Sequence, residues 1–179
     1  RFVLCNASGK ELARLTGIAE SSVTVDEGTA FKVNMLLKRL PRLRSGHCTP
    51  EQAFAGTFHL NEGYGQMQES YDSSCSGKMP ENPPGEMYCH TLTDPSILSS
   101  QLQSQGFQTL TLFGLDMPYR LFEKDNQQAR DTALQRYLAG INQYLDEPIE
   151  ECLAQDANDK LCIEAMSSVD LEKKIHLPK

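Results

Sequence analysis

The sequence predicts an α+β fold: a mixed, largely antiparallel sheet covered by helices on one face. Two observations predict it. Four segments carry apolar side chains at every second position, which is the period of a half-buried strand, and the stretches between them repeat apolar residues at three- and four-residue intervals, which is the period of a helix. With 179 residues, the chain has the length of one domain, or of one domain and a fragment of another.

The first twenty residues differ in character from the rest. Residues 2–5 (Phe-Val-Leu-Cys) are continuously apolar, as in a strand that is buried on both faces of a parallel sheet. A helix is expected next, because Ser8 and Glu11 have the spacing of a capping box. We therefore interpret residues 1–20 as a strand-and-helix remnant of another domain, residues 21–179 as the main domain, and the chain as a piece of a longer polypeptide.

Two half-buried strands are expected at the start of the main domain. The first covers about residues 29–37, where the alternating apolar residues are Phe31, Val33, Met35 and Leu37. After a basic loop over residues 41–50, a second strand is expected over residues 54–60, where the alternating positions are Phe54, Gly56, Phe58 and Leu60.

A helix, a strand, a broken helix and another strand are predicted to follow. Asn61 can cap the first of these helices and Gly77 can end it. Its predicted apolar face consists of Tyr64, Met67, Tyr71 and Cys75. The third strand is expected over residues 86–92, a short or broken helix over residues 96–105, and the fourth strand over residues 109–115.

The strongest helix signal lies between Asp125 and Pro148. Its apolar residues recur at three- and four-residue intervals and are Leu134, Tyr137, Leu138, Ile141 and Leu145. Pro148 stands where it can start another short helix. Residues 161–166 are expected to form a short strand, and residues 168–175 a final short helix.

Charge and composition argue against several classes of function. The chain has 24 acidic and 17 basic residues and a formal charge of −7, and it lacks the clustered Lys and Arg that binding to nucleic acid needs. No apolar run approaches the roughly 20 residues of a transmembrane helix. The six cysteines show no CxxC spacing, so we expect reduced thiols and a cytoplasmic location.

Local motifs predict no metal site and no catalytic residue. The pairs His47-Cys48 and Cys89-His90 place potential ligands next to each other, but neighbours on a strand point to opposite faces and do not easily hold one ion. The motifs GxGxxG, GxxxxGK[ST], GxSxG and HExxH are all absent from the chain.

The face of the predicted sheet that points away from the helices offers candidate substrate-lining residues. The alternation of the first two strands leaves Asn34 and His59 on that face, and we assign His90 and Phe113 to it on the other two strands. Such residues can simply face solvent, with each histidine held by a hydrogen-bond partner, or they can line the wall of a ligand cavity. The residues themselves leave both interpretations open.

Five segments of the chain follow one another in a recognisable order. They are Phe31-Lys32-Val33-Asn34, Gly56-Thr57-Phe58-His59-Leu60, Leu92-Thr93-Asp94-Pro95-Ser96, Leu112-Phe113 with Met117-Pro118-Tyr119, and Asp170-Leu171-Glu172 with Leu177-Pro178. In this succession the chain resembles the C-terminal half of the phytoene-dehydrogenase-related FAD oxidoreductases, including their pyridine nucleotide-disulfide oxidoreductase-like branch. The opening Val3-Leu4-Cys5-Asn6-Ala7-Ser8 resembles the strand and turn by which such proteins leave the flavin domain.

The resemblance implies a substrate-binding domain that lies over FAD in a larger oxidoreductase. It implies an apolar substrate of the polyene or isoprenoid type, a flavin-binding domain as the partner, and a parent protein that is cytoplasmic or attached to a membrane surface. The family's dinucleotide fingerprint is absent here, so we expect this chain alone neither to bind FAD nor to be active. The alternative is a free-standing, non-catalytic α+β binding or interaction module.

Overall fold

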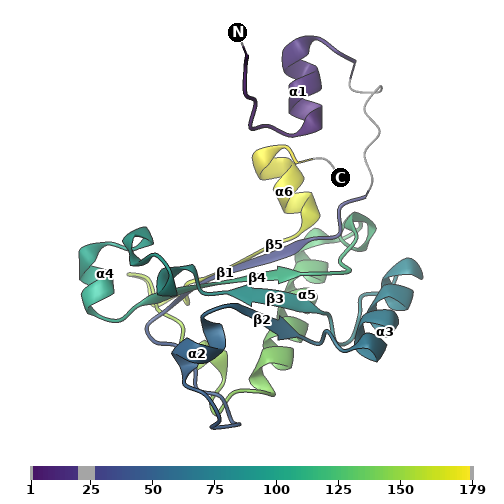
Figure 1. Cartoon of the computed structure of the whole chain (residues 1–179). Coiled ribbons are helices and arrows are strands. Elements are labelled where there is room, and N and C mark those ends of the chain that lie inside the picture. Colours follow the sequence, from purple (N-terminus) through teal and green to yellow (C-terminus); the bar gives the residue numbers. More distant parts are fainter. Residues whose placement is uncertain (1, 20–26, 178–179) are drawn as a thin grey trace.

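The chain forms an α+β structure on one five-stranded sheet, which confirms the predicted fold class (Figure 1). The computed structural model describes residues 2–19 and 27–177. The strands are arranged in the order β2-β3-β4-β1-β5, and each neighbouring pair is antiparallel. Their bounds are β1 (Phe31–Leu37), β2 (Thr57–Leu60), β3 (Gly85–Tyr88), β4 (Gln108–Gly114) and β5 (Ile163–Met166).

The longest helix, α5, runs along one face of the sheet (Figure 1). It begins where the sequence predicts, because the Asp125 carboxylate accepts a hydrogen bond from the Gln128 N–H at 3.0 Å. No helix in the described part of the chain has the length and apolar character needed to cross a membrane. The helices there are α1 (Gly9–Thr16), α2 (Pro50–Phe54), α3 (Tyr64–Cys75), α4 (Ser100–Ser104), α5 (Asn126–Asn142) and α6 (Ser168–Ile175).

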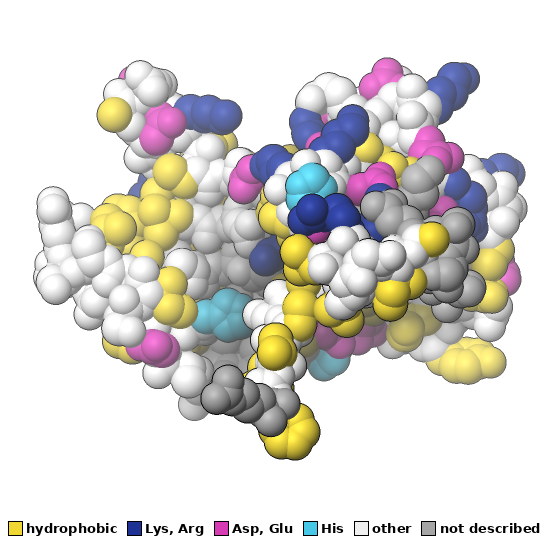
Figure 2. Space-filling view, turned by 90° about the horizontal axis from the view of Figure 1, so that it is seen from above, with side chains coloured by type: hydrophobic (Ala, Val, Ile, Leu, Met, Phe, Trp, Pro, Cys, Tyr) yellow, Lys and Arg dark blue, Asp and Glu magenta, His cyan; other side chains and the backbone are white. Residues whose placement is uncertain are grey.

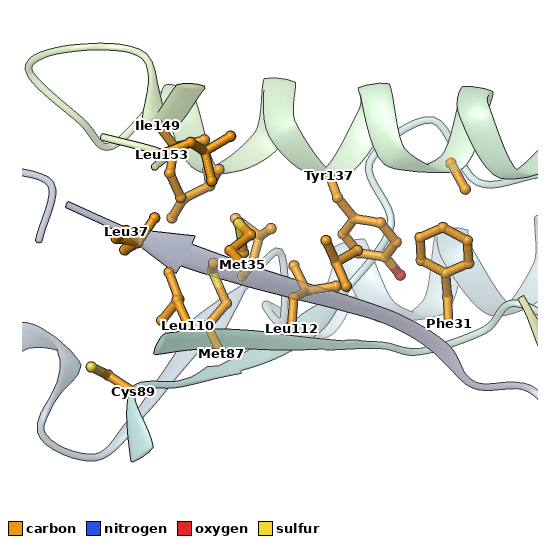
Figure 3. Packing of buried hydrophobic residues seen from close by; sticks show 14 of the residues in the cluster. Phe31, Met35, Leu37, Met87, Cys89, Leu110, Leu112, Tyr137, Ile149 and Leu153 are labelled. Carbon is orange, nitrogen blue, oxygen red and sulfur yellow. The ribbon is translucent and has the colours of Figure 1, made fainter. Parts of the chain in front are cut away.

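The hydrophobic core lies between α5 and the sheet (Figure 3). On β1 the predicted alternation holds, and the buried residues are Phe31, Val33, Met35 and Leu37. From the predicted apolar stripe of α5, Tyr137 and Ile141 are fully buried. The rings of Phe31 and Tyr137 stack with 5.7 Å between their centroids. Because α5 covers only one face of the sheet, the side chains on the opposite face do not belong to this core.

Tyr137 lies so close to the sheet that Gly114 beneath it has no room for a side chain, and the space at Gly85 is tight. A Cβ built on Gly114 would come within 2.2 Å of the Tyr137 Oη, and one on Gly85 within 3.2 Å of its Cε1. The Tyr137 hydroxyl donates a hydrogen bond to the Pro84 carbonyl at 3.0 Å, which satisfies the buried phenol. Burial raises the pKa of Tyr137 well above its usual value, so the side chain stays neutral.

We expect Gly114→Ala to lower the free energy of unfolding by about 3 kcal/mol, because the added methyl group would overlap the Tyr137 ring in a packed core. Gly56→Ala is the control: its Cβ would meet no atom within 4 Å, and we expect a change below about 0.5 kcal/mol. Urea unfolding followed by circular dichroism measures both variants. Equal stability of the two would contradict the close packing of Tyr137.

The side chain of Asp170 ties α6 to α5. Its Oδ1 accepts a hydrogen bond from Asn126 Nδ2 at 2.7 Å, and its Oδ2 accepts from Arg130 Nη1 at 3.1 Å and from the Ser167 N–H at 3.0 Å. Partial burial alone would raise the pKa of the Asp170 carboxyl. The Ser167, Asn126 and Arg130 donors outweigh burial and hold that pKa below its ordinary value of 3.8.

We expect Asp170→Asn to lower the free energy of unfolding by about 2 kcal/mol at neutral pH, because it removes hydrogen bonds to a charged acceptor. Since the folded-state pKa is depressed, this stabilisation is complete above the unfolded-state pKa and is lost as the pH falls through the folded-state value. Urea unfolding at several pH values should show the difference from wild type shrinking below about pH 4.

The control for this variant is Asp131→Asn. Asp131 is exposed on α5 and accepts hydrogen bonds from Gln127 one turn earlier, so its replacement should cost no more than about 0.5 kcal/mol. A loss in Asp170→Asn that stays constant down to about pH 2 would contradict the assigned role of the carboxylate.

Residues 2–5 do not form the predicted buried strand. Phe2, Val3 and Leu4 are 99%, 94% and 97% exposed, and they pair with no strand in the described part of the chain. A parallel strand is buried only when neighbouring strands and helices surround it, and the described residues place none there.

The helix predicted after this segment is present. Ser8 caps α1, and α1 lies beside α6, away from the sheet (Figure 1). Lys10 Nζ is 3.5 Å from Glu172 Oε1, and Ser8 Oγ donates a hydrogen bond to the His176 carbonyl at 3.1 Å. The predicted domain boundary after residue 20 falls outside the described residues.

The second predicted strand begins later than expected. Phe54 belongs to α2, which starts at a capping box formed by Thr49 and Gln52. This leaves only four residues for β2. The predicted cap of α3 is also wrong, because Asn61 adopts a φ of 56° and Gly63 is the N-cap.

The predicted apolar face of α3 does not point into the core. The buried residues of the helix are Ser70 and Ser74. Their small side chains let the backbone approach the rest of the chain, and Arg120 Nη2 donates a hydrogen bond to the Ser74 carbonyl at 2.7 Å. The spacing of the apolar residues therefore predicts the helix correctly but not which side of it is buried. The residues of the predicted apolar face are all exposed: Tyr64, Met67, Tyr71 and Cys75.

Candidate functional site

The sheet face opposite α5, here called the open face, carries two rows of side chains that each cross all five strands. Strand register sets both rows, because cross-strand partners point to the same side of a sheet. In the order β5, β1, β4, β3, β2, the first row is Met166, Lys32, Phe113, Glu86 and His59, and the second is Glu164, Asn34, Thr111, Tyr88 and Thr57.

The open face is concave. Figure 2 looks down on it and shows a hollow between raised parts of the molecule. A cavity of about 420 Å³ lies where β1 and β4 meet the segment that leads into β5. Asn34, Thr109 and Thr111 contribute polar groups to its lining, and the exposed charges at the cavity are Asp156, Lys160 and Glu164. Its apolar lining residues are Met35, Leu36, Leu161, Cys162 and Ile163.

Three polar side chains of this cavity lack hydrogen-bond partners. The Thr109 Oγ1 is shielded from solvent and bonds to no other group. Within residues 2–19 and 27–177, the Asn34 amide and the Thr111 hydroxyl also make no side-chain hydrogen bond, and the two residues are cross-strand partners. Buried polar groups are nearly always satisfied, and the shielded Thr109 hydroxyl is an exception to this rule. All three side chains offer uncharged donors and acceptors to a ligand or to water.

Aromatic side chains occupy the middle of the open face. The Tyr88 ring stacks on His90 at 6.0 Å and meets Phe113 edge-on at 5.8 Å, and Lys32 Nζ lies 5.4 Å from the centre of the Phe113 ring. The Tyr88 hydroxyl donates to the Glu86 carboxylate, which raises the pKa of Tyr88. A second cavity, of about 240 Å³, lies beside Tyr88, His90 and Thr57.

The structure places three of the four predicted substrate-lining residues on the open face by strand register. These are Asn34, His59 and Phe113. His90 is not on a strand, because β3 ends at Tyr88 and residues 90–92 form a 3₁₀ helix; only its stacking on Tyr88 brings it to this face. The four do not share one cavity, since Asn34 lines the larger one and His90 the smaller.

Sequence reasoning missed the other groups of the larger cavity. Thr109 and Thr111 alternate with buried Leu110 and Leu112 on β4. This alternation in the sequence was a signal that could have placed the two threonines on the same face as Asn34. The segment that closes the cavity from residue 156 to residue 162 has no periodic signal. Its position depends on the isolated pairing of residues 155 and 161 and on Leu36 of β1, whose N–H donates a hydrogen bond to the Cys162 carbonyl at 3.0 Å.

The residues of this chain do not fit the pyrophosphate of FAD. A dinucleotide site needs a glycine-rich turn at a free helix N-terminus, and no GxGxxG motif is present. Glycines do stand at two helix starts. Gly9 opens α1, but the Ser8 side chain caps that helix and Glu11 adds negative charge to its first turn. Gly63 is the N-cap of α3, but its N–H already donates a hydrogen bond to Gln66 Oε1 at 3.1 Å. FAD would have to be held by residues outside this chain.

Comparison with known proteins gives relatives but no family. No protein-family model matches the chain. Uncharacterized proteins of Mycobacterium bovis and of two strains of Mycobacterium tuberculosis are each 45% identical to it over 175 residues. The match covers 98% of this chain and 32% of each relative, so the chain spans about a third of the length of the curated relatives it matches.

Proposed function

We propose that this chain is the substrate-binding domain of a larger FAD-dependent oxidoreductase related to phytoene dehydrogenase, and that its open face forms one wall of the substrate site. The observation that carries the proposal is the 420 Å³ cavity on a sheet face that α5 leaves uncovered, with three unpaired polar groups in it. A volume of this size suits a small organic ligand, and such sites combine apolar walls with a few polar groups.

The cavity supports an apolar substrate that carries an uncharged polar group. Leu36, Leu161 and Ile163 offer apolar contact to a hydrocarbon chain of the polyene or isoprenoid type. Asn34 and Thr111 stand side by side and would orient a hydroxyl or carbonyl group by hydrogen bonds. FAD, where bound, supplies the acceptor for hydride from such a substrate, and this chain binds and orients the substrate and excludes water from it.

The flavin-binding domain in this proposal lies outside the chain. The mycobacterial relatives are about three times as long as the matched segment, which leaves room for such a domain in them. The six cysteines are all free thiols, which supports a cytoplasmic location, with the parent protein free or attached to a membrane surface. The chain alone is expected to be inactive.

The oxidoreductase proposal is tested on a full-length Mycobacterium tuberculosis relative. The purified protein should carry a flavin absorbance band and should release FAD on heating, whereas this chain alone should remain colourless after incubation with FAD. A relative that is colourless and takes up no added FAD would overturn the flavin assignment. A non-catalytic binding module would then be the better reading of the cavity.

Ligand binding by the cavity is tested separately, with all-trans-retinol as a polyene alcohol and its fluorescence as the readout. Asn34→Leu should weaken retinol binding to this chain about tenfold, because one hydrogen bond is lost. Asn82→Leu, the same change at an exposed position outside this cavity, should leave binding unchanged. Absence of retinol binding by the wild-type chain, or equal binding by both variants, would contradict the proposed site.

A further inference from the structure

A second group of chemically active side chains lies at the β2 edge of the open face, apart from the cavity. His59 on β2, Glu62 just after β2 and Glu86 on β3 each offer one ligand atom, and these three atoms lie within 4.8 Å of one another. Within the described residues this is the group of His, Cys, Asp and Glu side chains that comes together closely enough to hold one ion.

The fold brings these three residues together from separate positions in the sequence. His59 and Glu86 are direct cross-strand partners and point to the same face. The chain then turns at Asn61, which has a φ of 56° and whose Nδ2 donates a hydrogen bond to the Pro83 carbonyl at 3.1 Å. This turn directs Glu62 back onto the open face, where its carboxylate contacts His59 Nδ1.

The Glu62 carboxylate has an unsatisfied oxygen. Its side chain is only 17% exposed, and its Oε1 is shielded from solvent and has no hydrogen-bond partner. The other oxygen, Oε2, contacts His59, and the neighbouring Glu86 carboxylate accepts from the Tyr88 hydroxyl. A shielded carboxylate oxygen next to a second carboxylate is unfavourable unless positive charge reaches it. This observation is independent of the proximity of the three residues, and it points to a cation.

We propose that His59, Glu62 and Glu86 form a binding site for a first-row divalent cation such as Mn²⁺ or Zn²⁺. One imidazole and two carboxylates form a ligand set that these ions accept, and the imidazole disfavours Ca²⁺ and Mg²⁺. Two carboxylates supply the two negative charges that balance the ion. Three protein ligands leave coordination positions for water or for a ligand on the open face.

The present arrangement needs only small changes to bind an ion. Metal–ligand distances of about 2.1 Å place neighbouring ligand atoms roughly 3–4 Å apart. His59 and Glu62 are closer than that, and Glu86 completes the group within 4.8 Å. Because 56% of the His59 side chain is exposed, its ring can rotate without disturbing the core. The site is independent of the substrate proposed for the cavity.

The test is calorimetric titration of the chelator-treated full chain with Mn²⁺. Mn²⁺ is the first probe because the six thiols compete for Zn²⁺ but bind Mn²⁺ weakly. One ion should bind per chain. His59→Ala, Glu62→Gln and Glu86→Gln should each weaken binding at least about tenfold, as the loss of one ligand does. Circular dichroism confirms that each variant is folded, and the two Glu→Gln changes preserve side-chain shape.

Matched controls on the same face keep the proposal falsifiable. His90→Ala removes the exposed histidine that stacks on Tyr88, and Glu164→Gln removes the exposed carboxylate beside Asn34. Both should bind Mn²⁺ like the wild type. In addition, bound Mn²⁺ should broaden the NMR signals of the His59 ring and leave those of His176 sharp. No Mn²⁺ binding, binding that survives in all three ligand variants, or an equal loss in Glu164→Gln would overturn the site.

Discussion

The contact between Tyr137 of α5 and the glycines of β3 and β4 holds the helix against the sheet, and the rest of the structure depends on it. Gly114 and Gly85 are cross-strand partners; a side chain at Gly114 would overlap the Tyr137 ring, and one at Gly85 would crowd it. The phenol fills that space, stacks on Phe31 and donates to the Pro84 carbonyl. One buried side chain therefore joins α5 to β1, β3 and β4 at a single point.

Because α5 covers one face of the sheet so tightly, the side chains of the other face stay outside this core. Every residue that alternates with a core position on these strands must point away from α5, because side chains of a strand alternate between its two faces. The ten residues of the two rows on the open face follow from this rule and from the strand register. They include titratable, aromatic and amide side chains, so this face offers charged, apolar and hydrogen-bonding groups side by side.

The open face is chemically divided along the strand order. Near β5, β1 and β4 it has a cavity with apolar walls and uncharged donors and acceptors, where Asp156, Lys160 and Glu164 add exposed charges of both signs. Near β3 and β2 it has two carboxylates and an imidazole in one cluster. Tyr88 lies between the two regions, because it is the cross-strand partner of Thr111 and its hydroxyl contacts Glu86.

The sequence by itself determined the α+β class, the position of β1 and the start of α5, since alternation and capping involve residues only a few positions apart. It also predicted that Asn34 and His59 share a face, because each alternates with apolar residues on its own strand and one helix layer was expected to cover the apolar side of both. Only the tertiary structure decided that Thr111 lies beside Asn34, that Glu62 returns to His59, and that α3 buries Ser70 and Ser74. These outcomes depend on which strands pair and which surfaces pack. Such choices are set by contacts between residues far apart in the chain, and no local pattern carries that information.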